Sequence, residues 1–418
     1  VGIDRTTGAA SDGALYEHEF LPRGTRFDIR ITAEGRDDET MERDQSEGIP
    51  GPASSDTVKK LLEFIVDVLN SGAICLGGRT GSGQGKIRVI EPKLHRLSGT
   101  TDTGTLTTPA DILNTLIGQD EEGTSLPLEL GGWTLEEPAR ITIEWWSPTG
   151  IFIAEDEKLT KQRKAAKEAE NEEKGINEEV HEVVYPLRDP SEEWEKAQLL
   201  IPGTSIRGAL RSRASRIART VLAARGDLEP LASHDIHEQI AAEPNLVRYM
   251  FGCTEYRGAL TVHDCRSIER GTRVKVTHNA IDRWTGGVAD GALFSELLYP
   301  NAEWEAIRIE IDPERLKHNV RIDSPDTMID DAEALGRARA SWCLLCLALA
   351  ELCAGTLPLG GRTTRGLGEV TVSSLRIQNC NRRNPDDSEK RVVVDEPTGD
   401  LRGAKDILKY LRGEATTE

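Results

Sequence analysis

Two stretches of this sequence repeat each other, and the repeat limits the possible folds more than any other feature. Residues 2–8 read GIDRTTG, and residues 280–286 read AIDRWTG. The similarity continues without a gap to the strand-like triplet at 29–31, which matches residues 307–309 at the same offset of 278. A match of this length and register predicts two copies of one domain in a single chain.

A second pair of matching segments lies further along each copy. Residues 76–80 and residues 359–363 both read LGGRT, now at an offset of 283. Each segment follows apolar residues at helical spacing and precedes an alternating, strand-like stretch, so each copy is predicted to run strand, helix, glycine loop, strand. The expected strands are 27–31 and 86–89 in the first copy and 306–311 and 369–372 in the second, and the expected helices cover 58–69 and 335–352.

The second copy has more chain in front of it. Residues 140–145 alternate like a strand, and residues 201–205 read as a strand end followed by a helix start. Strand, helix, two strands, helix and strand is the order of the ferredoxin-like or RRM-like sandwich. The sequence therefore predicts an α+β fold with two such units, of which the first lacks its N-terminal half. The expected division is a first unit at 1–90, a linker at 91–138, a complete second unit at 139–378 with a charged insertion at 155–182, and a polar tail at 379–418.

The overall composition narrows the class of protein. The chain of 418 residues holds 52 Lys and Arg against 71 Asp and Glu, so its formal charge is −19. This acidity argues against a uniformly basic nucleic-acid binder and against a membrane-surface protein. The seven cysteines do not form a disulfide-like framework, and no stretch approaches the roughly 18 apolar residues of a membrane span. We expect a cytoplasmic protein without a membrane segment.

One segment reverses the sign of the charge. Residues 201–225 contain six arginines and no acidic residue. Three small residues stand where the helix begins, so its free backbone N–H groups would form an anion site, with two arginines one turn apart beside it. This pattern favours binding to an RNA or DNA backbone, whereas a solvated helix face, the alternative, normally mixes both signs. The residues concerned are Gly203, Thr204, Ser205, Arg207 and Arg211.

The glycine-rich loops carry a second indication of phosphate contact. They run from helix to strand, whereas a nucleotide-binding P-loop runs from strand to helix, so nucleoside-triphosphate binding is not expected. The Arg-Thr pair in both loops favours contact with a sugar-phosphate backbone over a purely structural turn. The candidate residues are Gly78, Arg79 and Thr80 in the first copy and Gly361, Arg362, Thr363 and Arg365 in the second.

The sequence predicts no metal site. Cys343 and Cys346 have metal-ligand spacing, but they lie inside an amphipathic helix and are more typical of core thiols. The acidic stretch at 155–157 is more typical of a solvated, partly disordered loop than of a divalent-cation site.

Four motifs resemble the RAMP superfamily. Residues 201–211 (IPGTSIRGALR) resemble its helix-opening motif, residues 250–264 its FG…G-x-L…D segment, and residues 360–368 its C-terminal glycine-rich loop. Residues 281–296 resemble the thumb hairpin of the backbone subunits of type III CRISPR-Cas effector complexes. The resemblance covers nearly all of the second unit, and the first unit only from the thumb onward.

The resemblance implies a fold and a function. Such subunits have an RRM-like core and stack along a guide RNA, and their thumbs insert at regular intervals into the guide–target duplex. The implied partners are guide RNA, target RNA and other effector subunits, in a ribonucleoprotein complex for antiviral defence. The helix start and the glycine-rich loops would grip guide phosphates. The thumbs would carry Ile3, Asp4 and Arg5 in the first copy and Ile281, Asp282, Arg283 and Trp284 in the second.

Catalysis is where this sequence departs from the family pattern. Active members cut target RNA with an Asp two residues ahead of a Pro, and Val184 stands at that position here. Valine can neither bind a metal nor activate a nucleophile, so we expect a binding unit without cleavage. The remaining acidic candidates are Glu182, Asp189 and Asp156, with Mg²⁺ as the cofactor in case of cleavage.

Two other functions remain open at this point. A metal-dependent RNA endonuclease of the same superfamily, cutting target RNA or a guide precursor, is the first alternative. A generic RRM-like protein that binds single-stranded RNA through aromatic platforms is the second. The expected strands lack the closely spaced aromatic residues of the RNP motifs, which counts against it.

Overall fold

The computed structural model describes residues 11, 19–33, 54–72, 74–96, 124–132, 138–176, 180–194, 196–224, 235–289, 292–323, 330–379 and 389–392. Internal contacts divide the chain into two compact units. The large unit combines residues 1–25, 81–83 and 137–418, and the small unit combines residues 26–80 and 84–136.

The large unit is built on a five-stranded antiparallel sheet. With a helix after β3 and another after β11, the strands β12-β3-β11-β6 have the arrangement of a ferredoxin-like sandwich, which confirms the predicted α+β class. The fifth strand, β13, comes from the predicted polar tail, whose residues 380–388 and 393–418 lie outside the described ones. In order across the sheet, the strands are β13 (Glu389–Val392), β12 (Thr371–Gln378), β3 (Ala139–Trp146), β11 (Ile307–Ile311) and β6 (Leu260–Val262).

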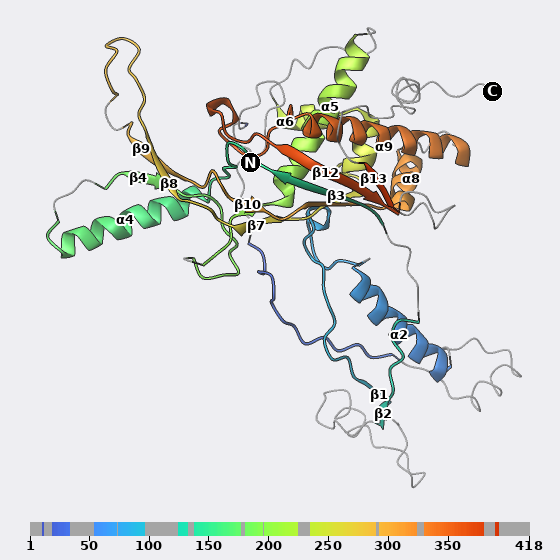
Figure 1. The fold of residues 1–418 in the computed structure, drawn as a ribbon. Coiled ribbons are helices and arrows are strands. Elements are labelled where there is room, and N and C mark those ends of the chain that lie inside the picture. Colours follow the sequence, from blue (N-terminus) through green and yellow to red (C-terminus); the bar gives the residue numbers. More distant parts are fainter. Residues whose placement is uncertain are drawn as a thin grey trace, which may run out of the picture. The chain divides into compact units, whose positions relative to one another are not determined.

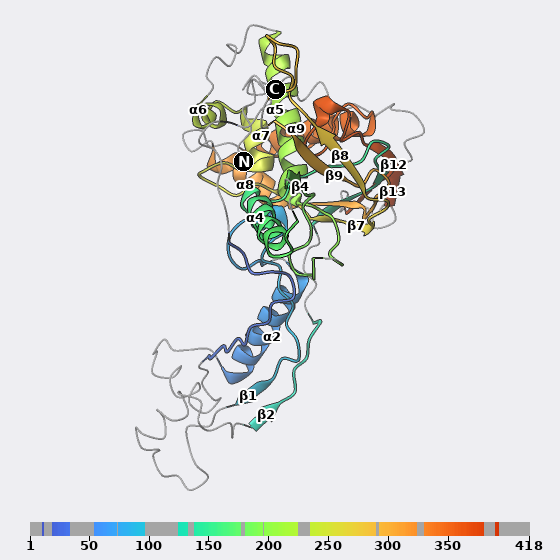
Figure 2. The same ribbon diagram turned by 90° about the vertical axis from the view of Figure 1, so that its left-hand side faces the viewer.

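Two long helices, α5 and α9, cover one face of this sheet (Figures 1 and 2). Alternate residues of β3 point into the interface: Ile141 and Ile143 are fully buried, as are Ile206 and Leu210 on α5. Burial of an aliphatic side chain of this size contributes roughly 1.5–3 kcal/mol, so this two-layer core fixes the elements that carry the site. The helices of the unit include α5 (Gly203–Ala223), α6 (Ile236–Ala241), α7 (Asn245–Phe251), α8 (Pro313–Ile322) and α9 (Asp331–Cys353).

A second sheet forms the base of a long hairpin. Its middle strand β9 is antiparallel to β8 and parallel to β4. Beyond β8 and β9 the chain extends away from the sheet, where the sequence predicts a thumb (Figure 1). The strands are β4 (Glu182–Val184), β9 (Phe294–Leu298) and β8 (Val274–His278), and a further small sheet contains β10 (Glu303–Trp304), β7 (Cys265–Glu269) and β5 (Leu200–Ile201).

The predicted charged insertion contains a helix, α4 (Glu157–Glu173). The sequence predicts a solvated, partly disordered loop for the acidic stretch at 155–157, whereas Asp156 caps this helix and Glu157 begins it. The guanidinium carbon of Arg163 lies 3.4 Å from the ring centre of Trp194, and Arg163 also pairs with the buried Glu155. These contacts attach α4 to the large unit. Sequence reasoning missed them because Trp194 lies far along the chain from Arg163.

The small unit is built around α2 (Ser55–Ser71), which confirms the helix predicted in the first copy. The side chain of Ser54 caps its start, and Gly72 ends it in the left-handed conformation with a φ of 75°. Within the predicted linker, β1 (Leu94–Arg96) pairs in antiparallel orientation with β2 (Thr124–Leu126).

The two strands predicted in the first copy are not formed. Residues 27–31 have no strand assignment, and of residues 86–89 only Lys86 makes an isolated bridge, to Cys75. A strand depends on its neighbours. In the second copy β11 pairs with β3, whereas no described residues of the small unit form an equivalent of β3. The exposed fractions of Phe27, Ile29 and Ile31 are accordingly 61%, 58% and 49%.

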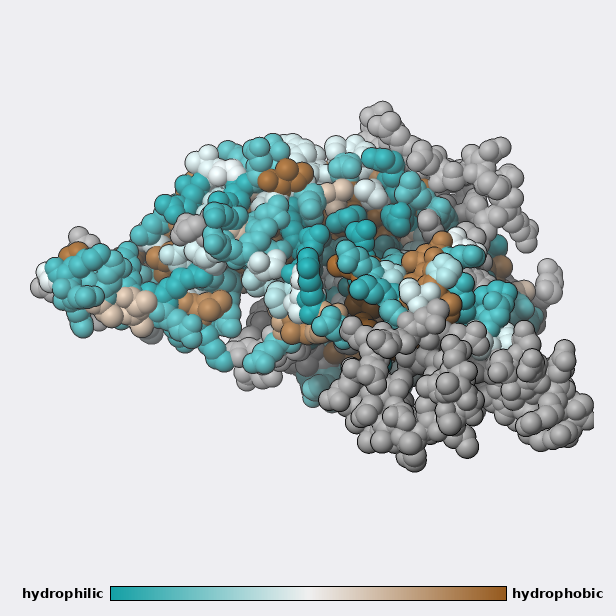
Figure 3. Space-filling view, turned by 90° about the horizontal axis from the view of Figure 1, so that it is seen from below, coloured by the Kyte–Doolittle hydropathy of each residue, from teal (hydrophilic) through white to brown (hydrophobic). Residues whose placement is uncertain are grey.

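On the face shown in Figure 3, the described residues are mainly hydrophilic, with hydrophobic residues in small scattered groups. Among the exposed apolar side chains of the described residues, Trp284 is 97% exposed. Within the described part of the chain, no helix is long and apolar enough to cross a membrane.

Candidate nucleic-acid interface

The thumb predicted in the second copy is the hairpin between β8 and β9, and its tip has a defined turn. The Asp282 carboxylate accepts hydrogen bonds from the backbone N–H groups of Thr285 and Trp284 at 2.8 and 2.9 Å. These bonds hold the pKa of Asp282 below its usual value. Trp284 is 97% exposed, and Ile281 and Arg283 are exposed beside it. The corresponding Ile3, Asp4 and Arg5 of the first copy lie outside the described residues.

The glycine-rich loop of the second copy is a tight turn between α9 and β12. The backbone N–H of Leu359 donates to the carbonyl oxygen of Gly368 at 2.9 Å and closes the loop. Gly368 has a φ of 89°, and a Cβ there would stand 2.5 Å from the Leu359 carbonyl oxygen, so glycine is required. The glycines thus shape the loop, while the side chains of Arg362 and Arg365 remain 36% and 47% exposed. Gly361 and Thr363 are exposed as well.

Arg362 is held by a buried carboxylate at the base of the thumb. Its Nε and Nη2 both lie 2.7 Å from Oε1 of Glu296, a residue of β9 that is 1% exposed. The other carboxylate oxygen lies 3.0 Å from Nε2 of His278 and 4.0 Å from Arg365. Sequence reasoning missed Glu296 and His278. The available signal was a lone acidic residue within a mainly apolar stretch of strand.

The first glycine-rich loop has the same local conformation around its arginine. Arg79 has a φ of 56° and Arg362 a φ of 60°, although both carry a Cβ that disfavours the left-handed region. Gly78 and Arg79 are exposed and Thr80 is half-buried. In each loop the Thr that follows the Arg opens a short 3₁₀ helix, η1 (Thr80–Ser82) or η2 (Thr363–Arg365).

The start of α5 is packed tightly against β6. A Cβ on Gly203 would stand 2.2 Å from the carbonyl oxygen of Val262, so glycine permits the close approach. The Gly203 backbone N–H donates to Oδ1 of Asp264 at 2.8 Å. The predicted anion site therefore already has an internal carboxylate on its first N–H group. Thr204 and Ser205 are half-buried beside it.

The two arginines predicted beside this helix start have partners inside the fold. The Arg207 guanidinium donates to the carbonyl oxygen of Phe251, and burial lowers the pKa of Arg207 to about 10. Arg211 pairs with Glu243 through Nε and Nη2, and the Glu243 side chain is 0% exposed. Arg211 also donates to the carbonyl oxygen of Gly252 at 2.9 Å. Both arginines therefore tie α5 to the segment around α7.

Most other described arginines of α5 also have internal partners. Arg213 pairs with Glu351 at 2.9 Å, and Arg219 donates to a backbone carbonyl oxygen. Arg216 is exposed on the outer side of the helix, and Arg225 lies outside the described residues. The arginine-rich segment thus serves mainly as internal scaffold. The sequence shows the charges of α5 but not the partners that fold onto them.

Val184, which the resemblance puts in the place of a catalytic Asp, lies in β4 opposite Glu296 of β9. The candidate Asp189 accepts hydrogen bonds from Arg266 and from the Ser191 hydroxyl, both at 2.6 Å. Burial alone would raise the pKa of Asp189, but these bonds outweigh it and hold the pKa below its usual value. A carboxylate stabilised in this way is a poor general base.

The other two acidic candidates are also in structural positions. Asp156 caps α4 by accepting a hydrogen bond from the Lys158 backbone N–H at 2.9 Å, and Glu182 is half-buried at the start of β4. Among the described residues, no group of three or more His, Cys, Asp or Glu side chains could hold a metal ion.

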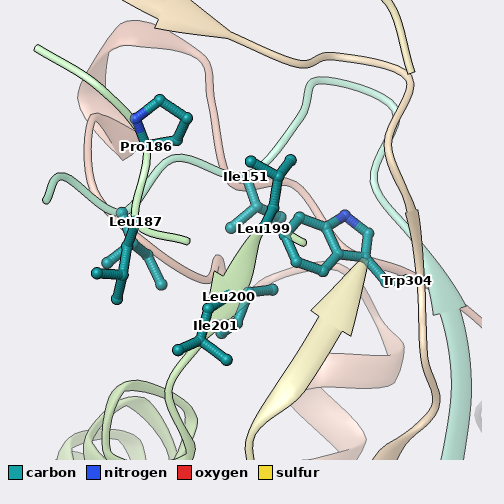
Figure 4. Close-up of a pocket in the computed structure, with 8 residues that line it drawn as sticks. Ile151, Pro186, Leu187, Leu199, Leu200, Ile201 and Trp304 are labelled. Atoms are coloured by element: carbon teal, nitrogen blue, oxygen red, sulfur yellow. The ribbon is translucent and has the colours of Figure 1, made fainter. Parts of the chain in front are cut away.

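A small cavity in the large unit is apolar (Figure 4). Ligand sites combine apolar walls with a few well-placed polar groups. The lining of this cavity holds no charged side chain, so we interpret it as a packing defect. The lining residues are Ile151, Ile153, Pro186, Leu187, Leu199, Leu200, Ile201 and Trp304.

A ferredoxin-like α+β unit, a long hairpin with an exposed tip and a glycine-rich loop with exposed arginines define the class of this domain. Residues 198–371 match the family model of the RAMP superfamily. A comparison with curated proteins found no match. Among solved structures, the cryo-EM structure of the type III-B Cmr-beta bound to cognate target RNA is similar at 12% identity and a TM-score of 0.30. The alignment covers 58% of this chain and 61% of that chain.

Proposed function

We propose that this chain is a guide-RNA-binding backbone subunit of a type III CRISPR interference complex that positions guide and target RNA for antiviral defence. The proposal rests on one combination within a RAMP-superfamily domain: a hairpin with an exposed aromatic tip and a glycine-rich loop with two exposed arginines. Phosphate contacts carry no sequence information, and an aromatic ring stacks on any base. This pairing suits a subunit that accepts any guide sequence.

The arginines among the proposed phosphate contacts are those whose side chains are exposed or partly exposed. Because Arg207 and Arg211 direct theirs into the fold, they act here as supports that fix α5. In the small unit, the exposed Arg79 has the backbone conformation of Arg362 and is proposed to make the corresponding phosphate contact. The proposed contacts are Thr204, Ser205, Arg216, Gly361, Arg362, Thr363 and Arg365 in the second copy and Gly78, Arg79 and Thr80 in the first.

In this proposal the tip of the thumb contacts a base of the RNA. Trp284 stacks on a base where the hairpin enters the guide–target duplex, and the Asp282 turn fixes the backbone that carries the indole before RNA binds. Tryptophan is among the residue types enriched at the energetic centres of interfaces. Thr6 stands at the matching position of the first copy, so the two thumbs differ in stacking capacity.

Cleavage of target RNA or of a guide precursor is the rival function. It requires a metal-binding or proton-accepting group near the phosphodiester bond. The matched position holds Val184, and each of the three acidic candidates has a structural partner or lies at an element boundary. We therefore propose the second unit as a binding unit without cleavage.

Co-purification tests the proposal. The full chain is expressed together with a CRISPR repeat–spacer array, and the nucleic acid bound to the purified protein is extracted and sequenced. RNA transcribed from the array supports the proposal, and a preparation with no RNA or with a random sample of cellular RNA contradicts it. The loaded protein is then incubated with labelled complementary RNA, with and without Mg²⁺. Intact target supports a binding unit, whereas Mg²⁺-dependent cuts at fixed sites support the endonuclease.

A further inference from the structure

We infer that Glu296 is a positioning residue that aims the guanidinium groups of Arg362 and Arg365 at an RNA phosphate and fastens the glycine-rich loop to the base of the thumb. The inference rests on the proposed function. It arises from four side chains on three elements of the large unit: Glu296 on β9, His278 on β8 and the two arginines in the glycine-rich loop. No sequence motif connects them.

Glu296 is the centre of this cluster. Its side chain is 1% exposed, and a charge so far from water requires charged or hydrogen-bonded partners. One carboxylate oxygen lies 2.7 Å from both Nε and Nη2 of Arg362, and the other lies 3.0 Å from Nε2 of His278 and 4.0 Å from Arg365. The two arginines are instead 36% and 47% exposed. Each ion pair thus runs from the interior to the surface.

The geometry of Arg362 explains how a buried carboxylate can favour the binding of a phosphate at the surface. A guanidinium carries five N–H donors on one rigid plane. Arg362 uses the edge formed by Nε and Nη2 for Glu296, so the plane is fixed and its remaining donors stay directed away from the carboxylate. A preorganised guanidinium loses less conformational freedom when it binds a phosphate. Arg365, on the same carboxylate, supplies a second positive charge nearby.

The backbone conformation of Arg362 indicates that its side chain has a function. Arg362 has a φ of 60°, a conformation that favours glycine. The loop has glycine at 360, 361, 366 and 368, so a glycine at 362 would remove the strain. Retention of a strained arginine indicates that its side chain is used. The repeat alignment puts His18 of the first copy in the place of Glu296, so by sequence this carboxylate belongs to the second copy.

The same contacts connect the glycine-rich loop to the thumb. Glu296 touches His278 on the neighbouring strand β8 and Arg362 in the loop, so a displacement of the hairpin base breaks ion pairs to the loop. Val184 of β4 lies opposite Glu296 in the parallel pairing. The strand position where active relatives hold an Asp is therefore next to an acid that orients arginines.

Two physical pictures predict opposite results for the removal of this charge. Electrostatics alone predicts tighter RNA binding, because loss of one negative charge leaves the site more positive. Positioning predicts weaker binding, because Arg362 and Arg365 lose the group that orients them. The sign of the change in RNA affinity therefore distinguishes positioning from electrostatics alone.

The test uses the full chain, a fluorescein-labelled single-stranded RNA of fixed mixed sequence, and Glu296→Gln. We expect an affinity about threefold to tenfold lower than that of the unmodified chain, a change typical of coupled groups. Glu144→Gln is the matched control: it removes one negative charge from β3, where Glu144 is 46% exposed and 3.7 Å from Arg376. The control is expected to bind RNA as tightly as the unmodified chain or slightly more tightly.

A double-mutant cycle shows whether Glu296 acts through Arg362. The variant with both Glu296→Gln and Arg362→Gln is expected to lose clearly less affinity than the sum of the two single losses, because only Arg365 is left for the acid to orient. Fully additive losses, or unchanged or tighter binding by a folded Glu296→Gln variant, overturn the inference.

Arg362→Lys covers the case in which Glu296→Gln fails to fold. Lysine keeps the charge but lacks the planar fork, so an affinity loss similar to that of Arg362→Gln is expected, and binding equal to that of the unmodified chain overturns the inference. Failure of the unmodified chain to bind RNA would instead contradict the proposed function.

Discussion

Replacement of Arg211 by alanine is expected to destabilise the large unit and to leave the number of phosphate contacts unchanged. Arg211 contacts Glu243 through Nε and Nη2, and the two side chains are 18% and 0% exposed, so solvent screens this pair only slightly. Loss of one partner of a buried ion pair costs about 3–5 kcal/mol, because the other charge stays buried with its compensation reduced. The bond to the Gly252 carbonyl oxygen is lost as well.

Urea unfolding of the full chain, followed by tryptophan fluorescence, measures this loss. With a slope of about 3 kcal/mol per molar urea, the midpoint is expected to fall by about 1–1.7 M. Arg216→Ala is the control on the outer side of the same helix, and its stability is expected to change by less than about 0.5 kcal/mol. The double replacement Arg211→Met with Glu243→Leu is expected to recover most of the loss, since no buried charge is left behind.

RNA binding as a function of salt gives the complementary measurement. Each lost phosphate contact lowers the salt slope by about 0.7 for single-stranded RNA. We expect this decrease for Arg216→Ala and no decrease for Arg211→Ala measured in buffer without urea. An Arg211→Ala protein with an unchanged urea midpoint and a slope lowered by about 0.7 would refute the structural role and make Arg211 a phosphate contact.

Three further predictions concern single positions. Gly208→Ala is expected to stabilise the protein by about 0.5–1 kcal/mol in urea unfolding, because Gly208 is exposed within α5 with open space around it. Gly203→Ala in the same helix is expected to be strongly destabilising, because its Cβ would meet the Val262 carbonyl oxygen at 2.2 Å. Trp284→Ala is expected to leave the urea midpoint unchanged and to weaken RNA binding by about 1–3 kcal/mol, measured by titration with labelled RNA; unchanged affinity contradicts base stacking. In the folded protein the pKa of Asp189 lies below its ordinary value of 3.8, so the ionised Asp189 side chain stabilises the fold. This contribution is complete above pH 3.8 and is lost as the pH falls through the folded-state pKa. The free energy of unfolding is therefore expected to fall less steeply below pH 5 in Asp189→Asn than in the unmodified chain.

The topology of the second copy could be predicted because local patterns agree with it. The alternation at Ile141 and Ile143, the helical spacing on α9 and the repeated glycine-rich loop each specify one element, and their order allows few folds. The same patterns in the first copy predict strands that do not form. Ile29 and Ile31 alternate like Ile307 and Ile309, but a strand also needs a partner to pair with.

The candidate site was harder to predict, because a sequence shows which side chains are charged but not which groups they contact in the fold. Arg207 and Arg211 read as surface cations, yet their partners are Phe251 and Glu243, which follow after other secondary structure. Only the folded chain brings these groups together. Glu296 shows the reverse case: an acid that reads as unfavourable for RNA binding lies under the arginines that remain exposed.

The acidic composition and the proposed RNA binding are compatible because several acids of this chain hold arginines in place. Glu243, Glu296 and Glu351 each pair with an arginine, so these residues add little net charge to the surface. The exposed contacts proposed on the second copy are the three arginines Arg216, Arg362 and Arg365, which predict a salt slope of about 2 in magnitude on single-stranded RNA. Under the proposed function, such a copy is expected to bind an unrelated RNA weakly. Two linked copies turn the second binding step into an intramolecular one, which raises the overall affinity by about 10²–10⁴ without further charge. The repeat and the acidity thus support the same mode of binding, in which affinity comes from aligned copies along one long guide.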